Sequence, residues 1–183
     1  LALKTAPAPV VVAARGMALG GGCELVLHGN AVQAHAELAA GLVEMKVGLI
    51  PAGGGTKEMV LRHTAGKSGA GLEQGLLTAF DLIAGARVSS SAAQARQMGV
   101  LQSADGVSMN RLRLLADAKG KALAMAENYS PITPAVRLLP GTTMVDRIHS
   151  LIDERLAADK IAPHDAVVAK QLAVIISGGN QPA

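Results

Sequence analysis

The sequence predicts an α/β fold, with short strands, glycine turns and helices in its N-terminal part and mainly helices in its C-terminal part. A continuous run of β-branched and small apolar residues at 10–14 is typical of a buried strand. The glycine triplet at 20–22 leads from this strand into a segment of helical periodicity. Beyond residue 109, apolar residues recur at helical spacing. Half of the 183 residues are hydrophobic, which suffices for the core of one domain.

The N-terminal elements are bounded by residues that interrupt regular structure. Gly16 ends the first strand, and Gly29 with Asn30 ends the first helix. The segment that Pro51 terminates mixes apolar and charged residues, and we expect it to be extended. The elements expected in this part are a strand at 10–14, a helix at 23–28 and strands at 31–36 and 43–50.

The middle of the chain carries helix start signals. Thr56 is placed to cap a helix that runs to about Ala65. Ser91, with Gln94 three residues later, forms a capping box for a helix that ends near Gly99. Another helix is expected at 72–84.

The C-terminal part reads as helices separated by a proline-spaced linker. We expect an amphipathic helix at 109–128, then the linker, and a last helix after Pro163. Between them, one helix face collects apolar side chains, namely Met144, Val145, Ile148, Leu151, Ile152 and Leu156. We therefore divide the chain into a core at 1–106 and a helical C-terminal region at 107–183, with a subdomain boundary at the linker.

The composition argues against several classes of function. The 17 basic residues exceed the 14 acidic ones only slightly and form no run, and the aromatic residues are only Tyr129 and Phe80, so we expect no nucleic-acid partner. No apolar stretch is long enough to span a bilayer. The single Cys23 excludes an intrachain disulfide and suits a reducing cytosol, so we expect a cytoplasmic protein. The histidines lack ligand spacing, and we expect no metal site.

Two glycine triplets, at 20–22 and 53–55, each precede a helical segment. Backbone N–H groups at such a position suit an oxyanion or a phosphate. Neither triplet fits a dinucleotide fingerprint or a phosphate-binding loop. On spacing alone, glycines that only make tight turns explain the pattern equally well.

Two blocks of sequence resemble the signature of the crotonase superfamily of enoyl-CoA hydratases and isomerases. They are PVVVAARGMALGGGCEL at 9–25 and GLIPAGGGT at 48–56, and the segment 84–99 is similar to the helix that follows in the family. The resemblance implies a spiral of strand-strand-helix turns capped by C-terminal helices, an acyl-CoA substrate and association into a homo-oligomer. It implies this fold from the N-terminal block onward, because no counterpart of the family's preceding portion is found before Leu1.

The resemblance also assigns site residues. Gly21 matches the position whose N–H forms half of the oxyanion hole, and Glu24 and Glu44 match the two catalytic glutamates. The neighbouring positions expected to bind substrate are Ala18, Leu19, Gly20 and Gly22. The chemistry agrees, because adding water to an activated double bond needs a base for the water proton and an acid for carbon. Fixed N–H donors stabilise the enolate charge.

Each assignment has a simpler alternative. A glutamate in a first helical turn, like Glu24, stabilises the helix dipole without any catalysis. Glu44 is equally compatible with a solvated strand position. Cys23 is better explained as a small buried residue than as an activated thiolate.

The C-terminal region is more similar to fused bacterial fatty-oxidation enzymes, which combine a hydratase with a 3-hydroxyacyl-CoA dehydrogenase. We expect the chain to be an internal piece of such a protein, with no cofactor of its own and NAD used only by the dehydrogenase part. Because half of the oxyanion hole is expected upstream, we predict little or no hydratase activity for the 183 residues alone. The alternatives are a crotonase-type isomerase and a non-catalytic scaffold or assembly segment.

Overall fold

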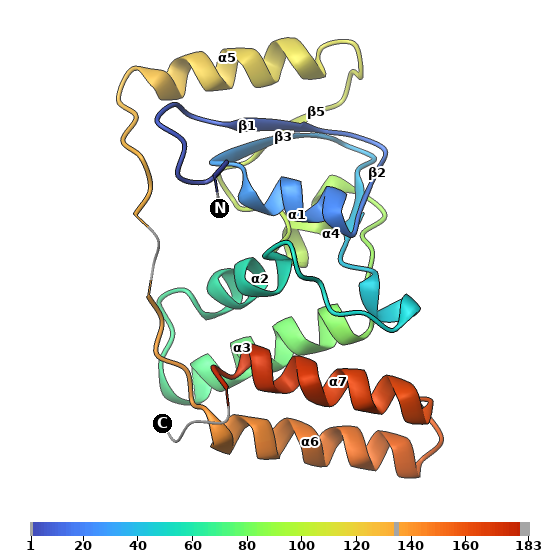
Figure 1. Ribbon diagram of the computed structural model, residues 1–183. Coiled ribbons are helices and arrows are strands. Elements are labelled where there is room, and N and C mark those ends of the chain that lie inside the picture. The colour runs from blue at the N-terminus through green and yellow to red at the C-terminus, as the bar shows by residue number, and fades with distance from the viewer. Residues whose placement is uncertain (1, 134–135, 180–183) are drawn as a thin grey trace. The chain divides into compact units, whose positions relative to one another are not determined.

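The structure is a computed structural model that describes residues 2–133 and 136–179 (Figure 1). These residues form two compact units, each built from separate stretches of the chain. Unit 1 comprises the described residues of Leu1–Leu42, Gly53–Gly55 and Val88–Ala135. Unit 2 comprises those of Val43–Ala52, Thr56–Arg87 and Val136–Ala183.

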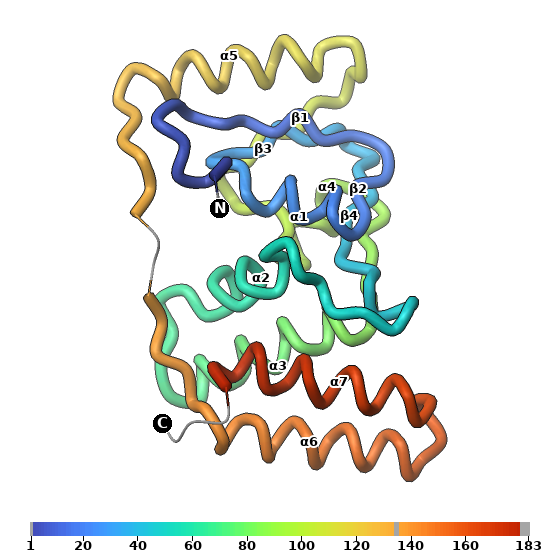
Figure 2. The backbone as a smooth tube through the Cα atoms, viewed as in Figure 1, coloured from blue at the N-terminus to red at the C-terminus, as the bar shows by residue number. Residues whose placement is uncertain are grey.

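Unit 1 contains two small parallel sheets. Its strands are β1 (Val11–Ala14), β2 (Met17–Leu19), β3 (Ala31–His35), β4 (Ala39–Gly41) and β5 (Gly106–Ser108). One sheet has the order β1-β3-β5 (Figure 1) and the other pairs β2 with β4 (Figure 2), in each case with parallel neighbours. The first strands of successive turns thus lie in one sheet and the second strands in the other, which is the ββα spiral that we predicted.

Helices cover the sheets of unit 1. They are α1 (Gly21–His28), α4 (Ala92–Gln97) and α5 (Leu114–Ala126). Helix α5 buries Leu114 and Ala118 and contacts β1 and β3. It therefore belongs to the same compact unit as the strands, although it lies in the range 107–183. The two compact units are each built from separate stretches of the chain, so they do not correspond to a single cut in the sequence. The domain boundary at 106/107 therefore stays a prediction.

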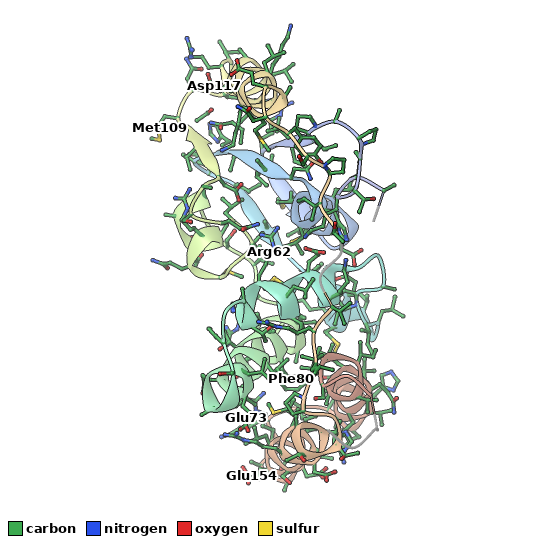
Figure 3. All side chains as sticks on the ribbon, turned by 90° about the vertical axis from the view of Figure 1, so that its left-hand side faces the viewer. Arg62, Glu73, Phe80, Met109, Asp117 and Glu154 are labelled. Carbon is green, nitrogen blue, oxygen red and sulfur yellow. The ribbon has the colours of Figure 1, made fainter. Side chains whose placement is uncertain are left out.

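Unit 2 is helical. It contains the short 3-10 helix η1 (Glu44–Val47), α2 (Gly55–Thr64) from its second residue onward, α3 (Gly69–Ala84), α6 (Thr142–Ala157) and α7 (Pro163–Ile176). Helix α7 contacts α6, α3 and η1. The apolar face predicted for α6 is largely confirmed, because Met144, Val145, Ile148 and Ile152 are buried. Phe80 of α3 is buried in the same unit (Figure 3). Ion pairs tie α6 to α3 at the surface, with Arg155 Nη2 2.9 Å from Asp81 Oδ1 and a second pair between Arg147 and Glu73.

Two local predictions are wrong. The segment 43–50 is not a strand, because Glu44–Val47 forms η1 and Gly48, at φ +74°, ends it with a left-handed turn. Thr56 does not cap α2 but lies within it, and its hydroxyl donates to the carbonyl of Pro51 at 3.0 Å. The N-cap predicted for α4 is confirmed, because Gln94 N–H donates to Ser91 Oγ at 3.2 Å, but the Gln94 side chain accepts from Ser90 N–H at 2.6 Å and not from Ser91 N–H as in a capping box.

Candidate active site

The start of α1 presents open backbone N–H groups. Gly20 precedes the helix at φ +53°, a conformation that glycine adopts without a steric penalty, and its N–H donates to Gly41 O of β4 at 2.9 Å. Gly21 and Gly22 form the first turn and are exposed, and a Cβ added at either would meet nothing within 4 Å. First-turn N–H groups have no partner within their helix, so this end can accept an anionic oxygen.

The other residues expected to bind substrate in this block lie directly before the turn. Ala18 and Leu19 belong to β2 and are half-buried. The pairing of β2 with β4 therefore fixes the backbone that leads into Gly20. Five predicted positions, Ala18 through Gly22, thus form one strand, turn and helix start within unit 1.

Glu24 is buried and held by a backbone donor. It lies in the first turn of α1 with 9% of its surface exposed. Gly55 N–H, from the second glycine triplet, donates to Glu24 Oε1 at 2.8 Å. A buried carboxylate needs such hydrogen bonds to offset the loss of hydration. The second triplet thus does present an N–H group to an acidic oxygen, and that oxygen belongs to a side chain of this protein.

All three glycines of the second triplet pack closely against side chains of α1. A Cβ on Gly53 would collide with the Glu24 carboxylate, and a Cβ on Gly55 would come within 2.9 Å of Glu24 Cγ. Gly54, at φ +103°, lies against the His28 ring, where a Cβ would come within 2.8 Å of the ring. The three glycines are therefore required by close approach and by backbone conformation, not by flexibility.

His28 joins the same cluster, although no sequence motif points to it. It is 5% exposed, and its Nδ1 lies 2.8 Å from the main-chain oxygen of Glu24. Because a carbonyl can only accept, Nδ1 carries the proton in this bond. The ring thus links the last turn of α1 to Gly54 on one side and to the backbone of Glu24 on the other.

Glu44 belongs to the other compact unit. It is the first residue of η1 and is half-buried. Its Oε2 is buried and has no hydrogen-bond partner among the described residues. The Cβ position of Gly48, at the end of η1, lies 3.3 Å from His164 Nε2 in the first turn of α7. The simpler alternative, a solvated strand residue, is thus wrong, since Glu44 is partly buried and helical.

Cys23 and the possible metal ligands add nothing to this site. Cys23 is fully buried in α1, as expected for a small core residue. In the part of the chain that the structure describes, no three His, Cys, Asp or Glu side chains cluster as a metal site would require. None of the described helices combines the length and apolar character of a membrane span.

Gly55→Ala is expected to disturb Glu24. The new methyl would come within 2.7 Å of Leu42 Cδ2 as well as 2.9 Å of Glu24 Cγ, so the carboxylate must shift or its bond to Gly55 N–H must lengthen. Such crowding costs about 1–3 kcal/mol, which thermal unfolding followed by circular dichroism can measure. Gly120→Ala in α5 is the control, because its Cβ would meet nothing within 4 Å. Equal unfolding midpoints for the two variants would contradict the close packing.

Comparison with known proteins identifies the family. Residues 1–112 match the pattern of the enoyl-CoA hydratase/isomerase family. A Bacillus subtilis protein named probable 3-hydroxyacyl-CoA dehydrogenase is 38% identical over 182 residues, which are 98% of this chain and 23% of that protein. A Rickettsia felis protein named as a fatty acid oxidation complex trifunctional enzyme is 48% identical over 68 residues, 37% of this chain and 9% of that protein.

The fold comparison agrees. The crystal structure of an enoyl-CoA hydratase from Bacillus anthracis matches with a TM-score of 0.55 and 24% identity, over 95% of this chain and 55% of that one. The chain thus spans about half of this solved structure and less than a quarter of the Bacillus subtilis relative. By its sequence pattern and its ββα spiral, the chain belongs to the enoyl-CoA hydratase/isomerase family and has the crotonase fold.

Proposed function

We propose that this chain is the hydratase segment of a larger fatty-acid oxidation protein and that the complete protein adds water to trans-2-enoyl-CoA thioesters. Membership of the family supports acyl-CoA chemistry. The names of the two relatives, a 3-hydroxyacyl-CoA dehydrogenase and a fatty acid oxidation enzyme, support the larger protein.

The observation that carries the hydratase proposal is the state of the Glu44 carboxylate. Its Oε2 is shielded from solvent and has no hydrogen-bond partner among the described residues. A buried carboxylate oxygen without a partner is costly, and a water molecule or a substrate group supplies the missing hydrogen bond. This is the property expected of a group that receives a proton from water.

Glu24 supplies the second carboxyl. One of its oxygens is fixed by Gly55 N–H at 2.8 Å, which orients the group. In hydration, the water oxygen bonds to the β-carbon and gives its proton to one carboxylate, while the other carboxyl delivers a proton to the α-carbon. Gly21 N–H, at the open start of α1, stabilises the charge that develops on the thioester oxygen.

Ala18, Leu19, Gly20 and Gly22 bind the substrate around that oxygen. The backbone of β2 and the first turn of α1 hold these residues in a fixed order. A fixed donor set needs no reorganisation when the enolate forms. NAD serves only the dehydrogenase part of the complete protein, and association into a homo-oligomer belongs to the same proposal.

Replacing Glu44 by Gln in the complete protein separates hydratase from isomerase. For a hydratase that uses both carboxyls, the rate of crotonyl-CoA hydration should fall about 10²–10⁴-fold, measured by the loss of absorbance of the conjugated thioester. An isomerase that moves protons with Glu24 alone should keep its conversion of 3-enoyl-CoA to 2-enoyl-CoA. Unchanged hydration in the variant contradicts the proposed role of Glu44. Glu37→Gln, at an exposed position, is the control.

A further inference from the structure

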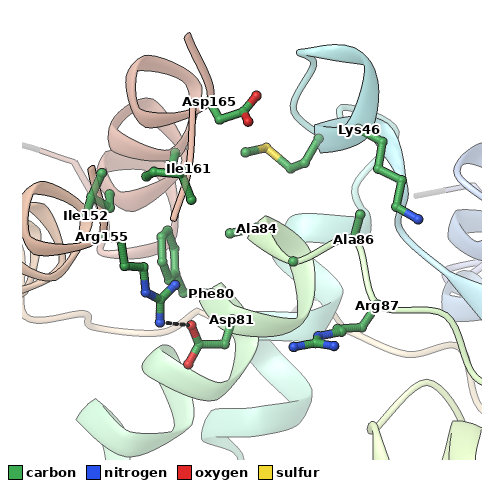
Figure 4. Close-up of a pocket in the computed structure, with 13 residues that line it drawn as sticks. Lys46, Phe80, Asp81, Ala84, Ala86, Arg87, Ile152, Arg155, Ile161 and Asp165 are labelled. Atoms are coloured by element: carbon green, nitrogen blue, oxygen red, sulfur yellow. Dashed lines mark hydrogen bonds and ion pairs between the residues drawn. The ribbon is translucent and has the colours of Figure 1, made fainter. Parts of the chain in front are cut away.

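Unit 2 contains a cavity of about 690 Å³ that the proposed reaction does not use (Figure 4). Its lining comes from η1, the end of α3, and helices α6 and α7. The apolar part of this lining is aliphatic apart from one aromatic ring, and it consists of Met45, Phe80, Ala84, Ala86, Ile152, Ile161 and Ala169. The volume lies in the range of small-molecule sites.

The apolar wall is part of the core and is not a loose surface patch. Phe80 and Ile152 are 2% and 1% exposed, and Met45 is 7% exposed. All three side chains therefore belong to the packed core of unit 2. A wall of this kind suits a flexible alkyl chain better than a flat ring, since the ring of Phe80 is buried and presents no open face for stacking.

The charges at the rim are unevenly distributed. Arg155 forms an ion pair with Asp81 at 2.9 Å, on the side of the pocket formed by α6 and α3. Lys46 of η1 and Arg87, which follows α3, are the other two cations of the rim (Figure 4). Both are exposed, and neither makes an ion pair or a side-chain hydrogen bond with the described residues. Asp165 of α7 is the remaining acid of the rim, and with Asp81 paired the two free cations outnumber it.

Arg87 directly follows Ala86, whose backbone is strained. Ala86 follows α3 at φ +45°, a left-handed conformation that favours glycine, yet its methyl group is buried and lines the cavity. Hydrogen bonds from Ala86 N–H to Ile83 O and from Arg87 N–H to Leu82 O hold the turn. Strain retained in this way is typical of positions where the surroundings fix the geometry of a site.

We propose that this cavity binds a medium-chain aliphatic carboxylate, with the alkyl chain on the apolar wall and the carboxylate on Lys46 and Arg87. The assignment follows from the lining of the cavity, which combines a largely aliphatic wall with two exposed cations that form no ion pair with the described residues. The site lies wholly within unit 2 and does not depend on the proposed hydratase activity. Because Met45 and Lys46 follow Glu44 in η1, such a ligand contacts the element that carries the proposed catalytic group.

Calorimetric titration of the full 183-residue chain with octanoate tests the site. Octan-1-ol, with the same chain and no charge, should bind at least about tenfold more weakly, because a charge-assisted hydrogen bond contributes more than a neutral one. Arg87→Gln and Lys46→Gln should each weaken octanoate binding about tenfold as well. Lys119→Gln, on the exposed face of α5 in unit 1, is the matched control and should leave binding within about twofold.

Methyl NMR locates the ligand. Octanoate should shift the signals of Ile152 and Ile161 in the cavity and leave Ile175, an exposed residue of α7 outside it, unchanged. Absence of binding at millimolar octanoate overturns the proposal. So does equal binding of octan-1-ol, or octanoate binding that neither rim variant weakens. These outcomes leave the hydration assay of the complete protein untouched, so the two proposals fail separately.

Discussion

Glu24→Gln is expected to lower crotonyl-CoA hydration by the complete protein about 10³-fold and to leave its fold intact. The substitution keeps the size of the side chain, and the amide oxygen can still accept from Gly55 N–H, which donates to Glu24 Oε1 at 2.8 Å. What it removes is the ability to exchange a proton at neutral pH. A group that transfers a proton in the transition state contributes about 10²–10⁴-fold to the rate, so the loss should appear in kcat.

The same variant distinguishes catalysis from helix stabilisation. If Glu24 served only the dipole of α1, its replacement would lower the free energy of unfolding by about 0.3–1 kcal/mol and leave the rate unchanged. The expected result is the reverse, a large loss of rate with a small change in unfolding midpoint. Kinetics and thermal unfolding on one preparation decide between them, with Glu37→Gln as the exposed control.

The sequence predicts the longer elements because each repeats a pattern over several residues. The run at 10–14 becomes β1 and the segment 31–36 becomes β3, and the helices predicted near 72–84 and after Pro163 are α3 and α7. Strands β2, β4 and β5 span three residues each, too few for an alternation to be visible. The strand predicted at 43–50 is wrong because the mixed polarity of this segment also fits a half-buried strand, while Gly48 at positive φ imposes a turn.

In the candidate site, too, residues within one sequence block can be predicted, whereas contacts between residues far apart in the chain cannot. Glu24 and Gly21 could be proposed because they stand in a recognisable block at the start of one helix. The bond from Gly55 to Glu24 joins residues far apart in the chain, and no periodicity reports such a contact. The glycine triplet at 53–55 was open to two interpretations for this reason. Only the packing of Glu24 and His28 against it explains why all three positions are glycine.

Glycine also fixes the packing of unit 2, and Gly75→Ala is expected to destabilise the protein by about 2 kcal/mol. Gly75 lies buried in the middle of α3, and a Cβ there would collide with the carbonyl oxygen of His63 near the end of α2. It would also come within 3.3 Å of Thr64 Cγ2. Alanine is favoured over glycine inside a helix by about 1 kcal/mol, so the collision must exceed this gain for the net change to be a loss.

Gly71→Ala in the same helix supplies the matched comparison. Gly71 is exposed, and its added Cβ would only meet Lys67 Cβ at 3.8 Å, which is ordinary contact. This variant should gain about 0.5 kcal/mol, because alanine restricts the unfolded chain without crowding the folded one. Thermal unfolding of the two variants should therefore shift in opposite directions from the parent. A rise in midpoint for Gly75→Ala would show that α2 and α3 can move apart to admit a methyl group, and that their close approach does not limit stability.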